Sequence, residues 1–159
     1  MEAALRFRDA EWAELLLFQD RRNMYPLFMN WHERLVAVIP TERLDELLPL
    51  LQGPQGMNYV VAVWRQRDVP MTPARLNHVL DVFVEAEADY GLEWRLPMLD
   101  WMALTAEDAS MPALLAYCLR VQQKCVELPG LHHPYHVEQL DRIVLLLQAK
   151  QTFIKEMPL

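Results

Sequence analysis

The chain has 159 residues, of which 53% are hydrophobic and 23% charged, a composition typical of a globular rather than a disordered protein. Its formal net charge of −7 argues against binding to nucleic acid, because affinity for a phosphate backbone comes from lysine and arginine. No unbroken apolar run approaches the roughly 20 residues that a membrane span needs. We therefore expect a single globular domain over residues 1–159 that binds neither nucleic acid nor membrane.

The expected location is the cytoplasm. The first residues interrupt their apolar positions with charges, unlike the continuous apolar stretch of a secretory signal. The two cysteines, Cys118 and Cys125, are too few for a disulfide framework, and on one helix they would lie about 10 Å apart along its axis, beyond bridging range. We expect both to be reduced thiols.

Leucine dominates the apolar residues, with 27 occurrences against 13 valines and 3 isoleucines, which favours helices over sheet. The clearest element is a helix over residues 73–89, begun by Thr72 as N-cap and ended by Gly91. Its helical spacing predicts an apolar face opposite an acidic stripe of Asp81, Glu85 and Asp89. We predict an all-α fold, a single-domain helical bundle.

A helical hairpin is expected at the C-terminus. Apolar residues recur at alternating spacings of three and four over residues 111–128 and again from Val137 to Ile154. Pro129 and Gly130 end the first helix and Pro134 begins the second, so the connection is short enough to make the helices antiparallel neighbours. The last helix is also apolar on its other side, which predicts either a central core helix or a homodimer contact.

Two stretches leave an alternative fold open. Residues 35–39 and 59–64 are rich in β-branched side chains and are also compatible with strands. An antiparallel pair within residues 35–64 would make the domain α+β.

The most unusual feature of the sequence is the segregation of its charge. Residues 81–108 hold eight acids and one base, Arg95, so this window has the same formal charge as the whole chain, −7. A local field of one sign orients an oppositely charged partner. The loop expected after the acidic helix adds aromatic residues, which interface centres favour. The predicted protein-binding residues are Asp81, Glu85, Asp89, Glu93, Trp94, Asp100, Trp101, Glu107 and Asp108.

Motifs for catalysis or cofactor binding are weak, so we expect no catalytic residue, cofactor or metal. The only serine, Ser110, lacks the glycines of a nucleophile elbow and is better placed as an N-cap. His132 and His136 have metal-ligand spacing, but Pro134 favours an extended chain before it and removes the helical geometry that this spacing needs. A solvated loop is the simpler interpretation of this cluster.

We expect a small acidic protein-binding domain whose partner is another protein with a basic surface. A neutralising, immunity-type inhibitor of a basic toxin or effector and a secretion chaperone are two jobs of this kind. The alternative is a self-assembling regulatory or structural subunit that dimerises through the C-terminal helix. An enzyme or metal-binding protein using the His132–His136 cluster is the third hypothesis.

Overall fold

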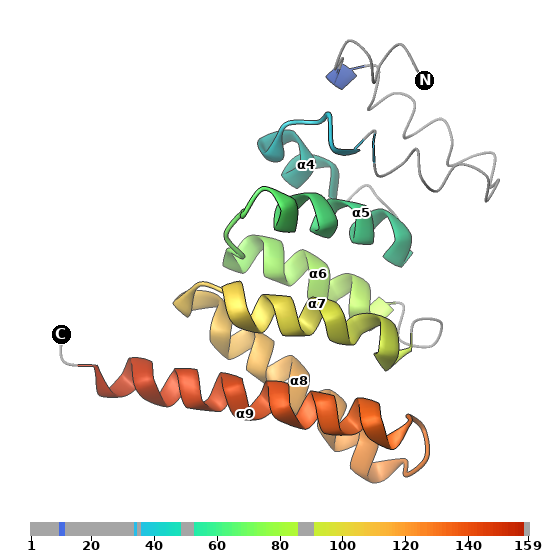
Figure 1. Cartoon of the computed structure of the whole chain (residues 1–159), viewed down its shortest axis with the longest axis vertical. Helices are drawn as coiled ribbons and strands as arrows, with labels where there is room; N and C mark the ends of the chain where they lie inside the picture. Colours follow the sequence, from blue (N-terminus) through green and yellow to red (C-terminus); the bar gives the residue numbers. More distant parts are fainter. Residues whose placement is uncertain (1–9, 12–33, 35, 49–52, 86–90, 158–159) are drawn as a thin grey trace. The chain divides into compact units, whose positions relative to one another are not determined.

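The computed structural model describes residues 10–11, 34, 36–48, 53–85 and 91–157 (Figure 1). The chain divides into two compact units, Met1–Val69 and Pro70–Leu159, and each is described here by itself. The expectation of one domain over residues 1–159 stays a prediction.

The described part of the first unit is helical. It contains α4 (Thr41–Leu47) and α5 (Gly53–Gln66). In α5 the buried Met57, Val61 and Trp64 recur at helical spacing, so they share one face. Arg67, just after α5, donates hydrogen bonds to Thr41 Oγ1 (3.1 Å) and to the carbonyl of Ala37 (2.8 Å). These bonds connect the end of α5 to the first residue of α4 and to the turn before it.

The α+β alternative is wrong for the described residues. Residues 59–64 lie inside α5, because a buried helical face outweighs the β preference of its valines. Residues 36–39 form a helical turn in which the Ile39 N–H donates to the Val36 carbonyl at 3.1 Å. Leu35 lies outside the described residues. The prediction of an all-α fold is confirmed.

The second unit contains α6 (Pro73–Glu85), α7 (Leu92–Thr105), a 3-10 turn η3 (Asp108–Ser110), α8 (Met111–Glu127) and α9 (Pro134–Glu156). Helix α6 begins as predicted, because Thr72 Oγ1 accepts a hydrogen bond from the Arg75 N–H at 3.4 Å. Its predicted apolar face, Leu76, Val79, Leu80 and Phe83, is buried. Residues 86–90 lie outside the described residues, and with them the predicted end of this helix.

The C-terminal hairpin is present as predicted, and α8 and α9 pack against each other (Figure 1). Gly130, with φ of 86°, turns the chain after α8, a conformation that favours glycine. His133 then caps α9 by accepting a hydrogen bond from the Tyr135 N–H, and Pro134 takes the first helical position. The buried residues of the predicted contact are Met111, Leu114, Cys118, Val121, Leu140, Val144 and Leu147, whereas Leu128 at its end is 56% exposed.

One expectation fails between α6 and α8. The segment expected as a loop is the helix α7, which carries Pro97 in its interior. Its buried residues cover a wide side of the helix, but its exposed side also carries the apolar Trp94 and Leu104, so apolar and polar positions are not clearly separated in the sequence. The buried residues are Leu92, Arg95, Leu96, Met98, Leu99, Trp101, Met102 and Ala103. Helix α7 packs on α8 and α9, while Glu93, Trp94 and Asp100 remain exposed on it.

Candidate functional site

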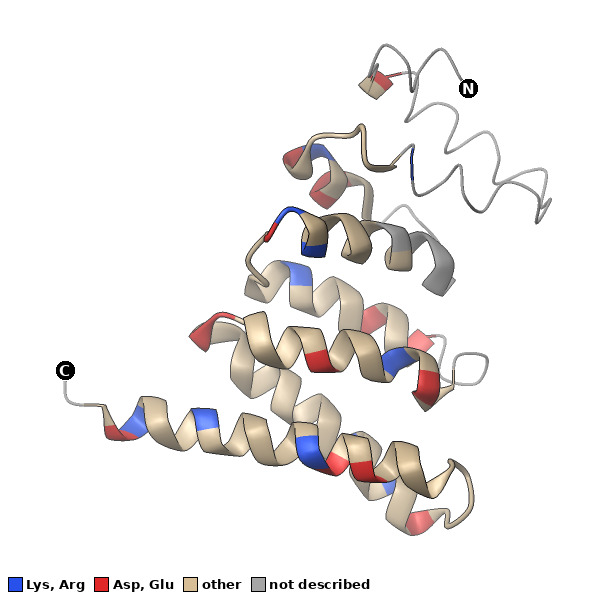
Figure 2. Cartoon of the chain, viewed as in Figure 1, with Lys and Arg blue, Asp and Glu red and all other residues tan. Residues whose placement is uncertain are grey.

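The acidic window lies on α6, α7 and η3 of the second unit. We call its exposed carboxylates the acidic surface: Asp81, Glu85, Glu93, Asp100, Glu107 and Asp108. Figure 2 shows acidic positions near the end of α6, along α7 and just after it. Two further acids of the window, Glu87 and the predicted binding residue Asp89, lie outside the described residues.

The acidic surface is not neutralised within the described part of the chain. No ion pair involves any of its carboxylates there, whereas Glu138 on α9 pairs with Arg142 at 2.8 Å. The window's one base, Arg95, is only 1% exposed and so does not contribute a positive charge to the protein surface. Among the described residues of this region, all the exposed charges are therefore negative, although its formal charge of −7 includes Arg95.

The two tryptophans of the predicted site differ in burial. Trp94 is 62% exposed, whereas Trp101 is 9% exposed. They lie seven residues apart on α7, which places them on the same side of the helix, but Trp94 is in the first turn. Trp94 is therefore available to a partner beside Glu93, and Trp101 belongs to the core.

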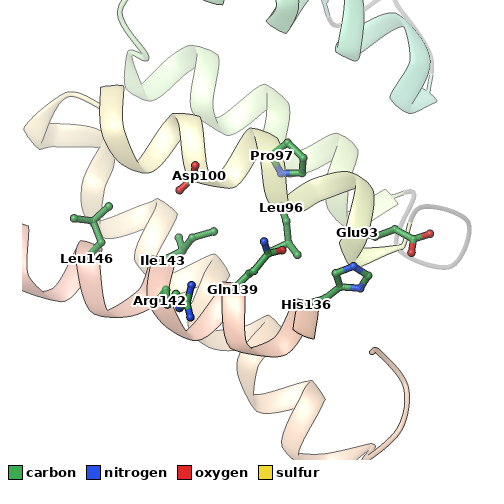
Figure 3. Close-up of a pocket in the computed structure, with 9 residues that line it drawn as sticks. All are labelled: Glu93, Leu96, Pro97, Asp100, His136, Gln139, Arg142, Ile143 and Leu146. Carbon is green, nitrogen blue, oxygen red and sulfur yellow. The ribbon is translucent and has the colours of Figure 1, made fainter. Parts of the chain in front are cut away.

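A cavity of about 380 Å³ adjoins the acidic surface between α7 and α9 (Figure 3). From α7 it is lined by Glu93, Leu96, Pro97 and Asp100, and from α9 by His136, Gln139, Arg142, Ile143 and Leu146. In Figure 3 Glu93 and His136 lie at one end of this cavity and Leu146 at the other. On the α7 side Leu96 and Pro97 lie between two carboxylates, which suits the stem and charged head of a lysine or arginine side chain, and Arg142 on the α9 side is paired with Glu138.

The contribution of α9 to this cavity was missed in the sequence. The apolar spacing of α9 predicted that it packs on α8. No sequence pattern indicated that Arg142 or His136 lies near the acidic residues of α7. The pattern that could have revealed them is the second apolar side of α9, where Ile143 is buried and Leu146 half-buried. That side faces α7, which the sequence did not identify as a helix.

The histidine cluster has a structural role at the start of α9. His133 Nδ1 accepts the hydrogen bond from the Tyr135 N–H at 3.2 Å, so the lone pair of this nitrogen is not available to bind a metal ion. The rings of His133 and His136 are 5.7 Å apart. Among the described residues, no three His, Cys, Asp or Glu side chains are grouped closely enough to hold a metal ion.

The remaining nucleophile candidates have structural surroundings. Ser110 occupies the N-cap position of α8 as predicted, but its side chain makes no cap hydrogen bond and instead donates to the Met71 carbonyl at 2.9 Å. Burial raises the pKa of the Cys118 thiol to about 12, which keeps it protonated and unreactive. Burial also raises the pKa of Cys125, against an opposing effect of Arg95.

Comparisons of this chain with protein-family models, with curated proteins and with solved structures found no match. Among the described residues, none of the helices has the length and apolar character required to cross a membrane. Function must therefore be argued from the chemistry of the surface, since a helical fold by itself is compatible with many activities.

Proposed function

We propose that this protein is a small cytoplasmic protein-binding domain that receives a basic partner on its acidic surface. The observation that carries the proposal is the set of six exposed carboxylates without an ion pair in the described part of the chain. Like charges four residues apart on a helix, as Asp81 and Glu85 are on α6, are unfavourable unless an opposite charge joins them. A partner's lysine and arginine side chains would supply that charge.

Two neighbouring features support a contact surface rather than a merely solvated one. Trp94 exposes most of its ring next to Glu93, and tryptophan is among the residues that contribute most to binding when an interface covers them. On its α7 side the α7–α9 cavity offers the apolar Leu96 and Pro97 between Glu93 and Asp100. A basic side chain inserted there would bury its apolar stem and keep its charge beside a carboxylate.

Two physiological roles are compatible with binding a basic partner protein. An immunity-type inhibitor would cover the basic active surface of a toxin or effector, and a secretion chaperone would hold a basic effector until its release. Electrostatic complementarity accelerates association in both cases. The inhibitor is expected to abolish its partner's activity in a purified mixture, whereas the chaperone is expected to raise its partner's solubility without abolishing activity after release.

The test is capture from the native host followed by mass spectrometry, with two variants of equal net charge. D81K/E85K/D100K reverses the acidic surface, and E42K/E127K/E156K reverses three exposed glutamates elsewhere. We expect wild type and the second variant to capture the same basic protein and the first variant to lose it. Equal capture by both variants would show that the acidic surface is not the binding site.

The kinetics of the captured pair provide a second measurement. Charge steering predicts that raising the ionic strength slows association of the wild type, because salt screens charges separated by more than a Debye length. The D81K/E85K/D100K variant should associate more slowly and depend less on salt. An association rate that is independent of salt in the wild type would remove the electrostatic basis of the proposal.

Self-assembly through α9 remains the second candidate function, because this helix exposes large apolar side chains. Leu145 is 65% and Phe153 67% exposed, outside the contact with α8. A homodimer would cover them. Sedimentation of the wild type and of L145E/F153E across a range of concentrations tests this candidate: a dimer that the variant abolishes supports it, and a wild type that stays monomeric contradicts it.

A further inference from the structure

A second cavity of about 400 Å³ lies where α7 begins, beside the end of α8 and the connection to α9. Its charged and titratable lining is mostly basic, in contrast to the acidic surface. We call it the basic cavity and define it by Glu93, Arg95, Lys124, His132, His133 and His136. It shares Glu93 and His136 with the α7–α9 cavity, but the proposed protein-binding function uses neither Arg95 nor Lys124.

Arg95 is the unusual residue of this cavity. It is 1% exposed, and its Nη1 donates a hydrogen bond to Tyr117 Oη at 2.7 Å. Its Nε has no hydrogen-bond acceptor, and no described carboxylate forms an ion pair with it. A buried cation is costly unless an anion and further hydrogen bonds compensate for its lost hydration. The structure thus holds a buried positive charge whose counter-ion is not among the described residues.

The start of α7 adds a second attraction for an anion. Gly91 is the N-cap of this helix and, having no side chain, makes no cap hydrogen bond; Leu92 is the first helical residue. The Trp94 N–H donates to the Gly91 carbonyl at 3.1 Å, so the N–H groups of Leu92 and Glu93 are the ones without partners within the helix, and the helix dipole places partial positive charge at this end. Both Gly91 and Leu92 line the cavity. Helix starts of this kind bind phosphate readily.

Further donors come from α8 and from the connection before α9. Lys124 is near the end of α8, and His132, His133 and His136 surround the start of α9. Ammonium and imidazole groups donate hydrogen bonds to anionic oxygens. Glu93 is the single carboxylate of this lining, and it would compete with a bound anion for the same donors.

We propose that the basic cavity binds a small phosphate-bearing ligand, whose oxygens accept hydrogen bonds from the guanidinium of Arg95, the ammonium of Lys124 and the first backbone N–H groups of α7. The planar guanidinium matches two phosphate oxygens at once, which a single amide or hydroxyl donor does not. The volume fits a compact ligand of small-molecule size. A long polyanion is disfavoured by the chain's net charge of −7.

The test is isothermal titration calorimetry of the full chain with inorganic phosphate, pyrophosphate and citrate. We expect one site per chain that takes pyrophosphate most tightly, with a matching rise in melting temperature. Citrate binding as tightly as pyrophosphate would overturn the assignment to phosphate. Absence of saturable binding for all three anions would overturn the site altogether.

Matched variants locate the bound anion. K124Q removes a lysine of the cavity and should weaken pyrophosphate binding roughly tenfold, whereas K155Q removes an exposed lysine near the end of α9 and should leave it unchanged. E93Q removes the competing carboxylate and should tighten binding severalfold. Equal affinities of K124Q and K155Q, or no gain in E93Q, would contradict binding in this cavity.

Arg95 itself is tested by R95M, with circular dichroism to check that the helices form. A folded R95M should lose pyrophosphate binding; if it does not fold, K124Q and E93Q decide. The chain's own acids Glu87 and Asp89, which precede Gly91 in the sequence, are examined with E87Q/D89N. Pyrophosphate binding that appears only in this variant would assign the cavity to an internal ion pair and overturn the proposal.

Discussion

Arg95 and Tyr117 are joined by a buried hydrogen bond of 2.7 Å that links α7 to α8. Both side chains are almost completely removed from solvent. Y117F would keep the ring and remove the acceptor, leaving a second nitrogen of Arg95 without a partner. We expect a loss of about 1.5–3 kcal/mol in the free energy of unfolding, the usual range when a buried charged group loses a hydrogen bond. Urea denaturation measures it.

The control for this prediction is Y135F. The Tyr135 hydroxyl also accepts a hydrogen bond, from Gln139 at 3.0 Å, but on an exposed part of α9. Water can replace that bond, so the change in stability should be within about 0.5 kcal/mol. Similar losses in the two variants would mean that the Arg95–Tyr117 bond contributes no more than a surface contact.

The contact between α8 and α9 is expected to provide much of the stability of the second unit. Leu147 is fully buried in it, whereas Leu145, two residues earlier on α9, is exposed. L147A removes buried apolar surface and leaves a cavity, so it should cost about 2–4 kcal/mol of unfolding free energy. L145A should cost less than about 0.5 kcal/mol. Comparable losses for the two variants, measured by thermal or urea unfolding, would contradict this orientation of α9.

Trp94 and Trp101 should separate binding from folding. W94A removes an exposed ring beside the acidic surface and should weaken binding of the captured partner by about 2 kcal/mol or more, with little change in melting temperature. W101A removes a buried ring and should lower the unfolding free energy by about 3–5 kcal/mol. Surface plasmon resonance and calorimetry measure the two effects. Full affinity in W94A would exclude this tryptophan from the interface.

The helices that could be predicted from the sequence are those in which residues typical of helix ends flank a regular apolar spacing. Helix α6 has Thr72 before it and one apolar face, and the α8–α9 hairpin has Gly130 and Pro134 between two regular apolar stripes. Helix α7 lacks so clear a pattern: Pro97 lies inside it, and its exposed side also carries large apolar residues, Trp94 and Leu104. Apolar residues on both the buried and the exposed side of a helix weaken the periodicity that identifies it in a sequence.

Because α7 was not predicted to be a helix, the burial of Arg95 was not predicted either. In the sequence it counted as the one base that partly offsets the acidic window. With α7 as a helix, Arg95 falls in the same stripe as the buried Met98, Leu99 and Met102, at spacings of three, four and seven. That spacing is the signal that could have found it. The acidic surface itself needed only the composition of residues 81–108, whereas the two cavities depend on tertiary contacts of α7.

The buried Cys118 thiol should make the folded protein less stable at alkaline pH. Burial raises the pKa of Cys118 from 9.0 to about 12, so between these values the unfolded chain loses a proton that the folded chain keeps. The folded state then binds more protons, and its stability falls as the pH rises, by up to about 1.4 kcal/mol per pH unit from this group. Below about pH 8 this contribution is negligible, because the thiol is protonated in both states.

Other groups also titrate in this range, so the comparison is between wild type and C118A at pH 7.5, 9 and 10.5. The lost volume of the thiol lowers the stability of C118A equally at each pH, whereas the alkaline decline should be shallower in this variant, by about 2 kcal/mol at pH 10.5. Urea unfolding gives both curves. Parallel curves would mean that the Cys118 thiol ionises in the folded protein as readily as in the unfolded chain, and therefore that α8 does not bury it.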